Sequence, residues 1–210
     1  MKKAFSVAVG LFMLLMLPVV SFSAAPGPYV SGQFGMAFLT NSDISVPPVT
    51  GTIESDPGFA TGFAGGYNFG MFRMEGEIGY QVNDIDKTSL CVGGICVSGL
   101  SSSGDVRALS FLVNGYFDFV NKTAFTPYIT AGIGAARLEV NDFEVLGIRM
   151  GDSNDTVFAY QVGAGIAYTV NKNFTIDLKY RYFATADPKF DDIEAEFASH
   201  NVYLGLRVNF

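Results

Sequence analysis

The chain has 210 residues and a formal net charge of −7, with 49% hydrophobic and 16% charged residues. This acidic balance excludes a protein that binds nucleic acid through a basic surface. Beyond Val20 no apolar run is long enough for a helix to cross a bilayer, so the apolar residues must alternate with polar ones or form short runs. The 24 glycines and the 14% aromatic content favour β structure over helix.

The N-terminal segment has the three-part pattern of a secretory signal peptide. Lys2 and Lys3 give a positive start, Ala4–Val20 is apolar, and Ser21–Ser23 places small residues before the expected cleavage point. We expect residues 1–23 to be removed, which leaves 24–210 as a single domain. An uncleaved anchor is the alternative, although the short apolar core and the small-residue site argue against it.

The rest of the chain contains eight segments in which apolar and polar side chains alternate, the period-two pattern of β-strands. Phe174–Phe183 is the clearest segment, with Thr175, Asp177, Lys179 and Arg181 on one face and aliphatic or aromatic residues on the other. Each segment has about the 9–11 residues that a tilted strand needs to cross a bilayer. In chain order they are Tyr29–Leu39, Phe59–Phe69, Phe72–Asn83, Arg107–Phe119, Thr126–Leu138, Phe158–Val170, Phe174–Phe183 and His200–Phe210.

The connections between these segments alternate between short and long. Short ones lie near 70–71, 120–125 and 171–173, and long ones near 40–58, 84–106, 139–156 and 184–199. The pattern predicts an all-β fold, an eight-stranded antiparallel up-and-down transmembrane β-barrel with short periplasmic turns and long extracellular loops. A soluble sandwich would also alternate, but its outward faces would be polar. Here the apolar faces carry aromatic residues at both ends, as at the two surfaces of a membrane. We therefore expect the outer membrane of a Gram-negative-type bacterium.

The polar faces of the strands carry four cations and four anions that would point into the barrel. An eight-stranded barrel has room for little more than its own side chains, and unpaired buried charges are costly, so these groups must pair. We expect a charge network that plugs the lumen, with inward glycines leaving space for the long side chains. A narrow ion path gated by the same pairs is the alternative. The eight residues are Arg73, Glu75, Glu77, Asp118, Asp177, Lys179, Arg181 and Arg207.

Three strands carry a family resemblance. The last strand, Asn201–Phe210, ends on phenylalanine and resembles the C-terminal signal read by the outer-membrane barrel assembly machinery, on the residues Tyr203, Gly205, Leu206, Arg207 and Phe210. The segments Pro127–Ala135 and Tyr160–Tyr168 resemble strands of the opacity-protein and surface-antigen family of small barrels, related to the OmpA-type transmembrane domain. The resemblance covers the whole mature chain. It implies a surface antigen, an adhesin or a structural protein of the outer membrane.

The two cysteines and the single histidine are candidates for chemical roles. Cys91 and Cys96 lie in a long connection of an exported protein, and we expect them to form a disulfide that stiffens the loop tip. Further metal ligands are not near them in the sequence, so no metal site or cofactor is expected. His200 is the single histidine. Outer-membrane lipid A deacylases use a histidine and a nearby serine on a barrel surface, but Val202 stands where the serine would be needed.

Three functions remain open from the sequence. The first is a structural or adhesin-like surface protein that acts through its extracellular loops, two of which are acidic. The second is a narrow porin-like channel for ions or small solutes. The third is a lipid-modifying enzyme, which the lack of a nucleophile–base pair makes the weakest. We expect no enzyme activity and a monomer. The expected partners are outer-membrane lipid, lipopolysaccharide, the assembly machinery and host or cell-surface ligands.

Overall fold

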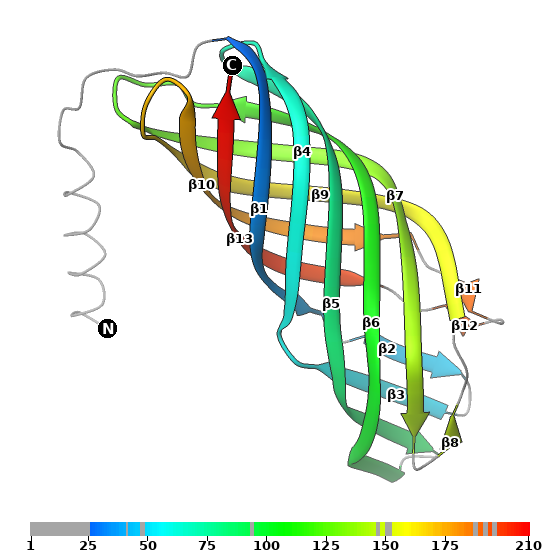
Figure 1. Ribbon diagram of the computed structural model, residues 1–210. Coiled ribbons are helices and arrows are strands. Elements are labelled where there is room, and N and C mark those ends of the chain that lie inside the picture. Colours follow the sequence, from blue (N-terminus) through cyan, green and yellow to red (C-terminus); the bar gives the residue numbers. More distant parts are fainter. Residues whose placement is uncertain are drawn as a thin grey trace, which may run out of the picture.

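The chain folds as a closed antiparallel barrel of eight long strands (Figure 1). The computed structural model describes residues 26–40, 42–46, 49–92, 95–145, 148–149, 153–186, 189–190, 193–194 and 197–210, and side chains within 26–40, 56–84, 104–139, 154–186 and 197–210. The barrel strands are β1 (Gly27–Leu39), β4 (Gly58–Asn68), β5 (Phe72–Val92), β6 (Ile95–Asp118), β7 (Phe125–Val145), β9 (Ser153–Thr169), β10 (Phe174–Thr185) and β13 (Ala198–Asn209).

Each barrel strand pairs with its two neighbours in sequence, and the last strand pairs with the first. Tyr29 of β1 lies opposite Asn209 of β13, and the pairing runs on to Leu39 opposite Ser199. The order β5-β4-β1-β13-β10-β9-β7-β6 closes through the β5–β6 pair. Closure satisfies backbone groups that would otherwise be exposed to lipid. The predicted fold class and all eight predicted segments are confirmed.

An asparagine organises each of the three short turns. The side-chain oxygen of Asn68 accepts a hydrogen bond from Gly70 N (2.8 Å), that of Asn121 from Thr123 N (2.7 Å), and that of Asn171 from Asn173 N (2.9 Å). An asparagine that bonds the backbone two residues on imitates a turn by itself. In the first turn Gly70 takes φ +104°, a conformation that favours glycine. The strand directions then place all three turns at one end of the barrel.

The polarity of the barrel is the reverse of that of a soluble protein. Its outer surface carries large apolar side chains: Phe63 is 71% exposed and Phe34 57%, while Glu77 inside is 2% exposed. A lipid environment stabilises this arrangement, in which aliphatic and aromatic groups face outward and charged groups face inward. Among the described residues, no helix is both long and apolar enough to cross a membrane.

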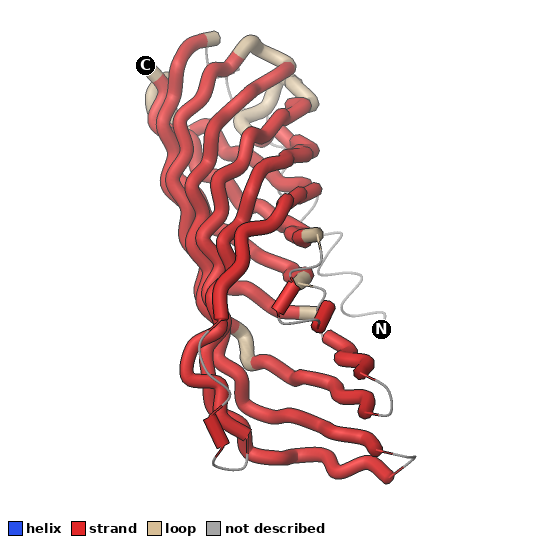
Figure 2. Tube along the Cα trace, turned by 90° about the vertical axis from the view of Figure 1, so that its right-hand side faces the viewer, coloured by secondary structure: helices blue, strands red, loops and turns tan. Residues whose placement is uncertain are grey.

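At the end opposite the short turns, strands continue past the rim of the barrel, where the sequence predicted only long connections (Figure 2). β5 and β6 stay paired to Val92 opposite Ile95, with register shifts on the way. β2 (Ser42–Val46) pairs with β3 (Val49–Ser55), β3 pairs with β5, and β8 (Ile148–Arg149) pairs with β7. β11 (Lys189–Phe190) and β12 (Ile193–Glu194) form a separate small hairpin. Period-two apolar alternation is weak in these segments, so the sequence did not reveal them as strands. The predicted signal peptide, 1–23, lies outside the described residues.

Candidate functional site: the lumen and the outer rim

The charged residues predicted to face inward all lie in the lumen, and most form direct ion pairs. Near the short turns, Arg73 Nε lies 2.7 Å from Asp118 Oδ2, and its Nη2 donates to Oδ1 at 2.9 Å. Arg207 Nη2 lies 3.1 Å from Asp177 Oδ1. The Arg73–Asp118 pair is bidentate, which is among the stronger interactions available to buried charges, whereas Arg207 reaches both Asp177 oxygens through Nη2 alone. The two pairs connect neighbouring strands, β5 to β6 and β10 to β13, on the inner face of the barrel wall.

Glu77 holds the middle of the lumen. Arg181 Nη1 donates to Glu77 Oε1 at 2.7 Å, and Lys179 Nζ lies 3.8 Å from Oε2. Asn114 Nδ2 donates to Oε2 at 2.8 Å. Arg181 also contacts the Tyr203 hydroxyl and lies with its guanidinium 4.6 Å from that ring's centroid. One carboxylate on β5 thereby binds cations from β10 on the far wall.

Glu75 is held by hydroxyl and amide groups that sequence reasoning missed. It accepts hydrogen bonds from Tyr29 Oη (2.8 Å), Tyr116 Oη (2.5 Å) and Asn114 Nδ2 (3.3 Å). Neither Tyr29 nor Tyr116 was assigned to the lumen from the sequence. The alternation of faces along the strand could have indicated this: Tyr116, for example, is the strand partner of the inward-facing Arg73, and paired residues share a face. The lumen is thus a mixed network of charges, phenols and amides.

Inward glycines leave room for these bulky groups, as the sequence suggested. Gly165 lies opposite Tyr128, and a Cβ added there would come within 2.5 Å of the tyrosine hydroxyl. Gly66 lies opposite Tyr29, and its added Cβ would lie 2.9 Å from Tyr29 Cζ. A tyrosine on one strand therefore occupies the space that the missing side chain on the next strand leaves.

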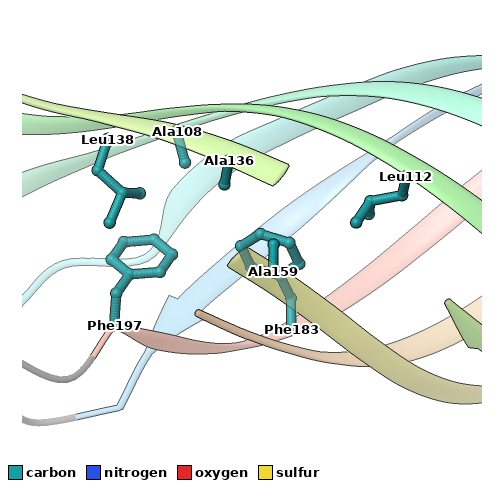
Figure 3. Close-up of a cluster of buried hydrophobic side chains, with 7 residues drawn as sticks. All are labelled: Ala108, Leu112, Ala136, Leu138, Ala159, Phe183 and Phe197. Carbon is teal, nitrogen blue, oxygen red and sulfur yellow. The ribbon is translucent and has the colours of Figure 1, made fainter. Parts of the chain in front are cut away.

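The outer part of the lumen contains an apolar cluster that the sequence did not predict, beside buried polar side chains such as Gln81, Gln161 and Ser199. Seven buried side chains form an apolar seal there, and Figure 3 shows them gathered between facing strands. Phe183 and Phe197 pack edge to face with ring centroids 6.1 Å apart. The charge network is therefore only part of what occupies the lumen, because these apolar side chains also pack inside the barrel. The apolar seal consists of Ala108, Leu112, Ala136, Leu138, Ala159, Phe183 and Phe197.

Little space remains between the side chains of the network. A cavity of about 30 Å³ is lined by residues that include Arg73, Glu75, Tyr116, Lys179 and Tyr203. This volume holds about two water molecules. In the part of the chain with described side chains, no group of three or more His, Cys, Asp or Glu is arranged to hold a metal ion.

The remaining candidate residues lie on the rim and on the last strand. His200 faces outward, and its Nδ1 lies 2.7 Å from Tyr180 Oη. Tyr203 and Arg207 of β13 point into the lumen, whereas Leu206 and Phe210, the residue after β13, face outward. Cys91 and Cys96 are backbone partners across the β5–β6 hairpin, but their side chains lie outside those described. The acidic residues of the third and fourth connections lie largely outside them too.

Comparison with known proteins places this geometry in a family. Residues 7–210 match the family described as outer membrane protein beta-barrel domain. The outer membrane protein PagN of Salmonella typhimurium (strain LT2) is 26% identical over 235 residues, covering 95% of this chain and 98% of PagN. A Rickettsia conorii protein described as a candidate adhesin is 27% identical over 163 residues, covering 63% of this chain and 66% of that protein. Neisserial surface protein A has the same fold, with a TM-score of 0.57, 21% identity and coverage of 88% of this chain and 97% of its own.

Proposed function

The chain belongs to the outer membrane protein beta-barrel domain family and resides in the outer membrane, and we propose that it is an adhesin-like surface protein whose extracellular segments make the contacts. The barrel acts as a rigid, closed stand. The single observation that carries this proposal is the filled lumen. A network of buried pairs and the apolar seal occupy the lumen, and we infer that the surface available for interaction is the set of strands that continue beyond the rim.

A relative described as a candidate adhesin supports the choice of adhesion over a purely structural role. Loops carried on a rigid scaffold are the usual location of binding residues. The long β5–β6 hairpin is the most extended of these segments, with strand pairing from the barrel to its tip. We propose that Cys91 and Cys96 form a disulfide there. Their direct backbone pairing supports this proposal, because paired positions on neighbouring strands bring Cα atoms to about the 4.4–6.8 Å that a disulfide needs.

A narrow channel remains the second candidate, and the charged lumen is the observation in its favour. The small cavity counts against it, since about 30 Å³ cannot hold a hydrated ion. For His200 we propose no catalytic role. The described groups around its ring are Tyr180 and Tyr182, whose ring centroids lie 6.0 and 5.2 Å away. These are aromatic neighbours rather than a nucleophile, and they suit the membrane–water interface.

Three further features complete the proposal. Residues 1–23 act as a cleaved signal peptide, and the end of β13 acts as the assembly signal, with the outward Leu206 and Phe210 available to the assembly machinery. The barrel works as a monomer, because a closed barrel needs no partner to satisfy its edges.

The test is a variant in which each long connection is replaced by a tight Asn-Gly turn, which favours hairpins. In the second connection, residues 85–104 are replaced, because Asp84 lies opposite Asp105. Non-adherent bacteria expressing the full or trimmed protein are compared for attachment to epithelial monolayers and to one another. We expect attachment to fall by about tenfold or more, equivalent to ~1.4 kcal/mol, while heat-modifiable migration shows an intact barrel. Undiminished attachment by the folded, trimmed barrel would contradict the proposal.

A further inference from the structure

Two arginines lie side by side on the outer surface of the barrel, away from the lumen. Arg107 is on β6 and Arg137 on β7, adjacent strands in Figure 1. Arg107 lies opposite Glu139, and Arg137 lies opposite Leu109, so the two arginines are diagonal neighbours. Diagonal positions on paired strands are about 7–8 Å apart, within reach of a single ligand for long side chains. Their side chains are 44% and 52% exposed.

The height of this pair on the barrel is defined by the apolar belt. Exposed apolar residues lie on the same outward face, next to the arginines on the side of the short turns. They are Leu109, its strand partner Tyr80, Phe111 and Ile133. Because the short turns are periplasmic, the arginines lie at the outer edge of the belt, where lipid headgroups begin. Among the described side chains, no other cation faces outward at this end of the barrel.

Each guanidinium is oriented by a carboxylate two residues along its own strand. Asp105 Oδ2 lies 2.6 Å from Arg107 Nε, and Asp105 Oδ1 accepts from Nη2 at 3.4 Å. Glu139 Oε1 lies 2.9 Å from Arg137 Nε. Both carboxylates lie farther from the membrane than their arginines. An arginine has five N–H donors, so each keeps donors on the edge that its carboxylate does not use.

We infer that Arg107 and Arg137 bind the phosphate groups of the phosphorylated glycolipid in the outer leaflet of the outer membrane. The occupant follows from the position, since the outer leaflet of this membrane presents lipid phosphates at the height of the arginines. It also follows from the chemistry, since guanidinium donors match phosphate oxygens in a bidentate geometry. Exposed ion pairs contribute only about 0–1 kcal/mol to the free energy of folding, so a stabilising role accounts poorly for these two pairs. The inference is independent of what the extracellular segments bind.

The experiment measures the dissociation constant for lipid A of the full refolded barrel in phosphatidylcholine nanodiscs. Three double variants are compared with the original: Arg107→Gln with Arg137→Gln, Asp105→Asn with Glu139→Gln, and Lys122→Gln with Lys172→Gln. The last pair removes the same charge from exposed turns at the periplasmic edge and is the matched control. Dephosphorylated lipid A and inorganic phosphate serve as ligand controls.

We expect the arginine variant to lose about tenfold or more in lipid A affinity, the order expected for losing charge-assisted hydrogen bonds. The carboxylate variant should bind as well as the original or more tightly, because it removes negative charge beside the phosphate. The lysine variant should bind lipid A with unchanged affinity. Dephosphorylated lipid A should bind the original protein and all three variants with equal affinity. Equal losses in the arginine and carboxylate variants would reveal a structural ion-pair cluster instead. Unchanged affinity in the arginine variant, or full competition by inorganic phosphate, would also overturn the assignment.

Discussion

Arg181 and Glu77 are 104 positions apart in sequence, yet Arg181 Nη1 donates to Glu77 Oε1 at 2.7 Å across the lumen. The contact joins β10 to β5, which lie on opposite sides of the closed sheet order. It can form only when the barrel is complete. The Arg181–Glu77 contact therefore depends on barrel closure, and it links the opposite walls formed by β5 and β10.

Removing one partner of this pair should be strongly destabilising. In Arg181→Met, Glu77 keeps Lys179 at 3.8 Å but loses its shortest ion pair. Breaking a buried pair costs about 3–5 kcal/mol, and we expect a loss of free energy of unfolding near the lower end. Urea unfolding of the barrel refolded in vesicles measures this. The exposed pair provides the control: Arg137→Gln should change the free energy by less than about 1 kcal/mol. Equal effects at both positions would contradict the importance of the buried network.

Filling the space beside Tyr128 should also destabilise the barrel. A Cβ at Gly165 would lie 2.5 Å from both Tyr128 Oη and Leu178 O, so Gly165→Ala forces the wall or the tyrosine to shift. Overpacking of this kind costs about 1–3 kcal/mol. Gly76→Ala is the matched control, because an added Cβ there meets nothing within 4 Å. The same urea titration measures both variants. A neutral Gly165→Ala would mean that tyrosine and glycine are not packed together.

The apolar seal should matter more than the lipid-facing surface. Phe183→Ala leaves a cavity beneath Phe197 and Leu138, and buried Phe→Ala changes cost about 3–5 kcal/mol. Phe63→Ala removes an equal side chain from the outer face, where lipid chains refill the space and no cavity remains. We expect the free energy of unfolding to fall clearly more for Phe183→Ala. The reverse order would place the apolar seal outside the stable core of the barrel.

The predicted disulfide is open to direct chemical measurement. Protein purified without reductant should be refractory to alkylation at Cys91 and Cys96 after denaturation, and should gain two alkyl groups once reduced. The oxidising compartment favours this outcome. Barrel stability should change little on reduction, because the bond would join adjacent positions of one hairpin and not two walls. Mass spectrometry counts the alkyl groups. Two groups without reductant would show free thiols.

Strand parity made much of this fold accessible from sequence. Phe174–Phe183 sorted Lys179 and Arg181 onto one face, and that face is the lumen. Parity assigns a face, however, and says nothing of which residue lies across the barrel. The match of Glu75 with Tyr29 and Tyr116 depends on strand tilt and register, which no local pattern encodes.

The apolar seal was missed for a related reason. Leu138, Phe183 and Phe197 come from different strands or strand ends, and each is an isolated apolar residue on an otherwise polar or small face. Only their convergence in the folded barrel makes them a cluster. The strands beyond the rim were missed because neither face is buried in lipid there, so the selection for apolar alternation ends although backbone pairing continues.

The central claim is that the barrel is a closed stand rather than a channel. Conductance of the refolded, heat-modifiable protein in a planar lipid bilayer tests it most directly. We predict no steady openings, because the network around Glu77 and the apolar seal fill the lumen. Stable, ion-selective openings that disappear when Arg181 or Glu77 is altered would contradict the account and assign the protein as a channel.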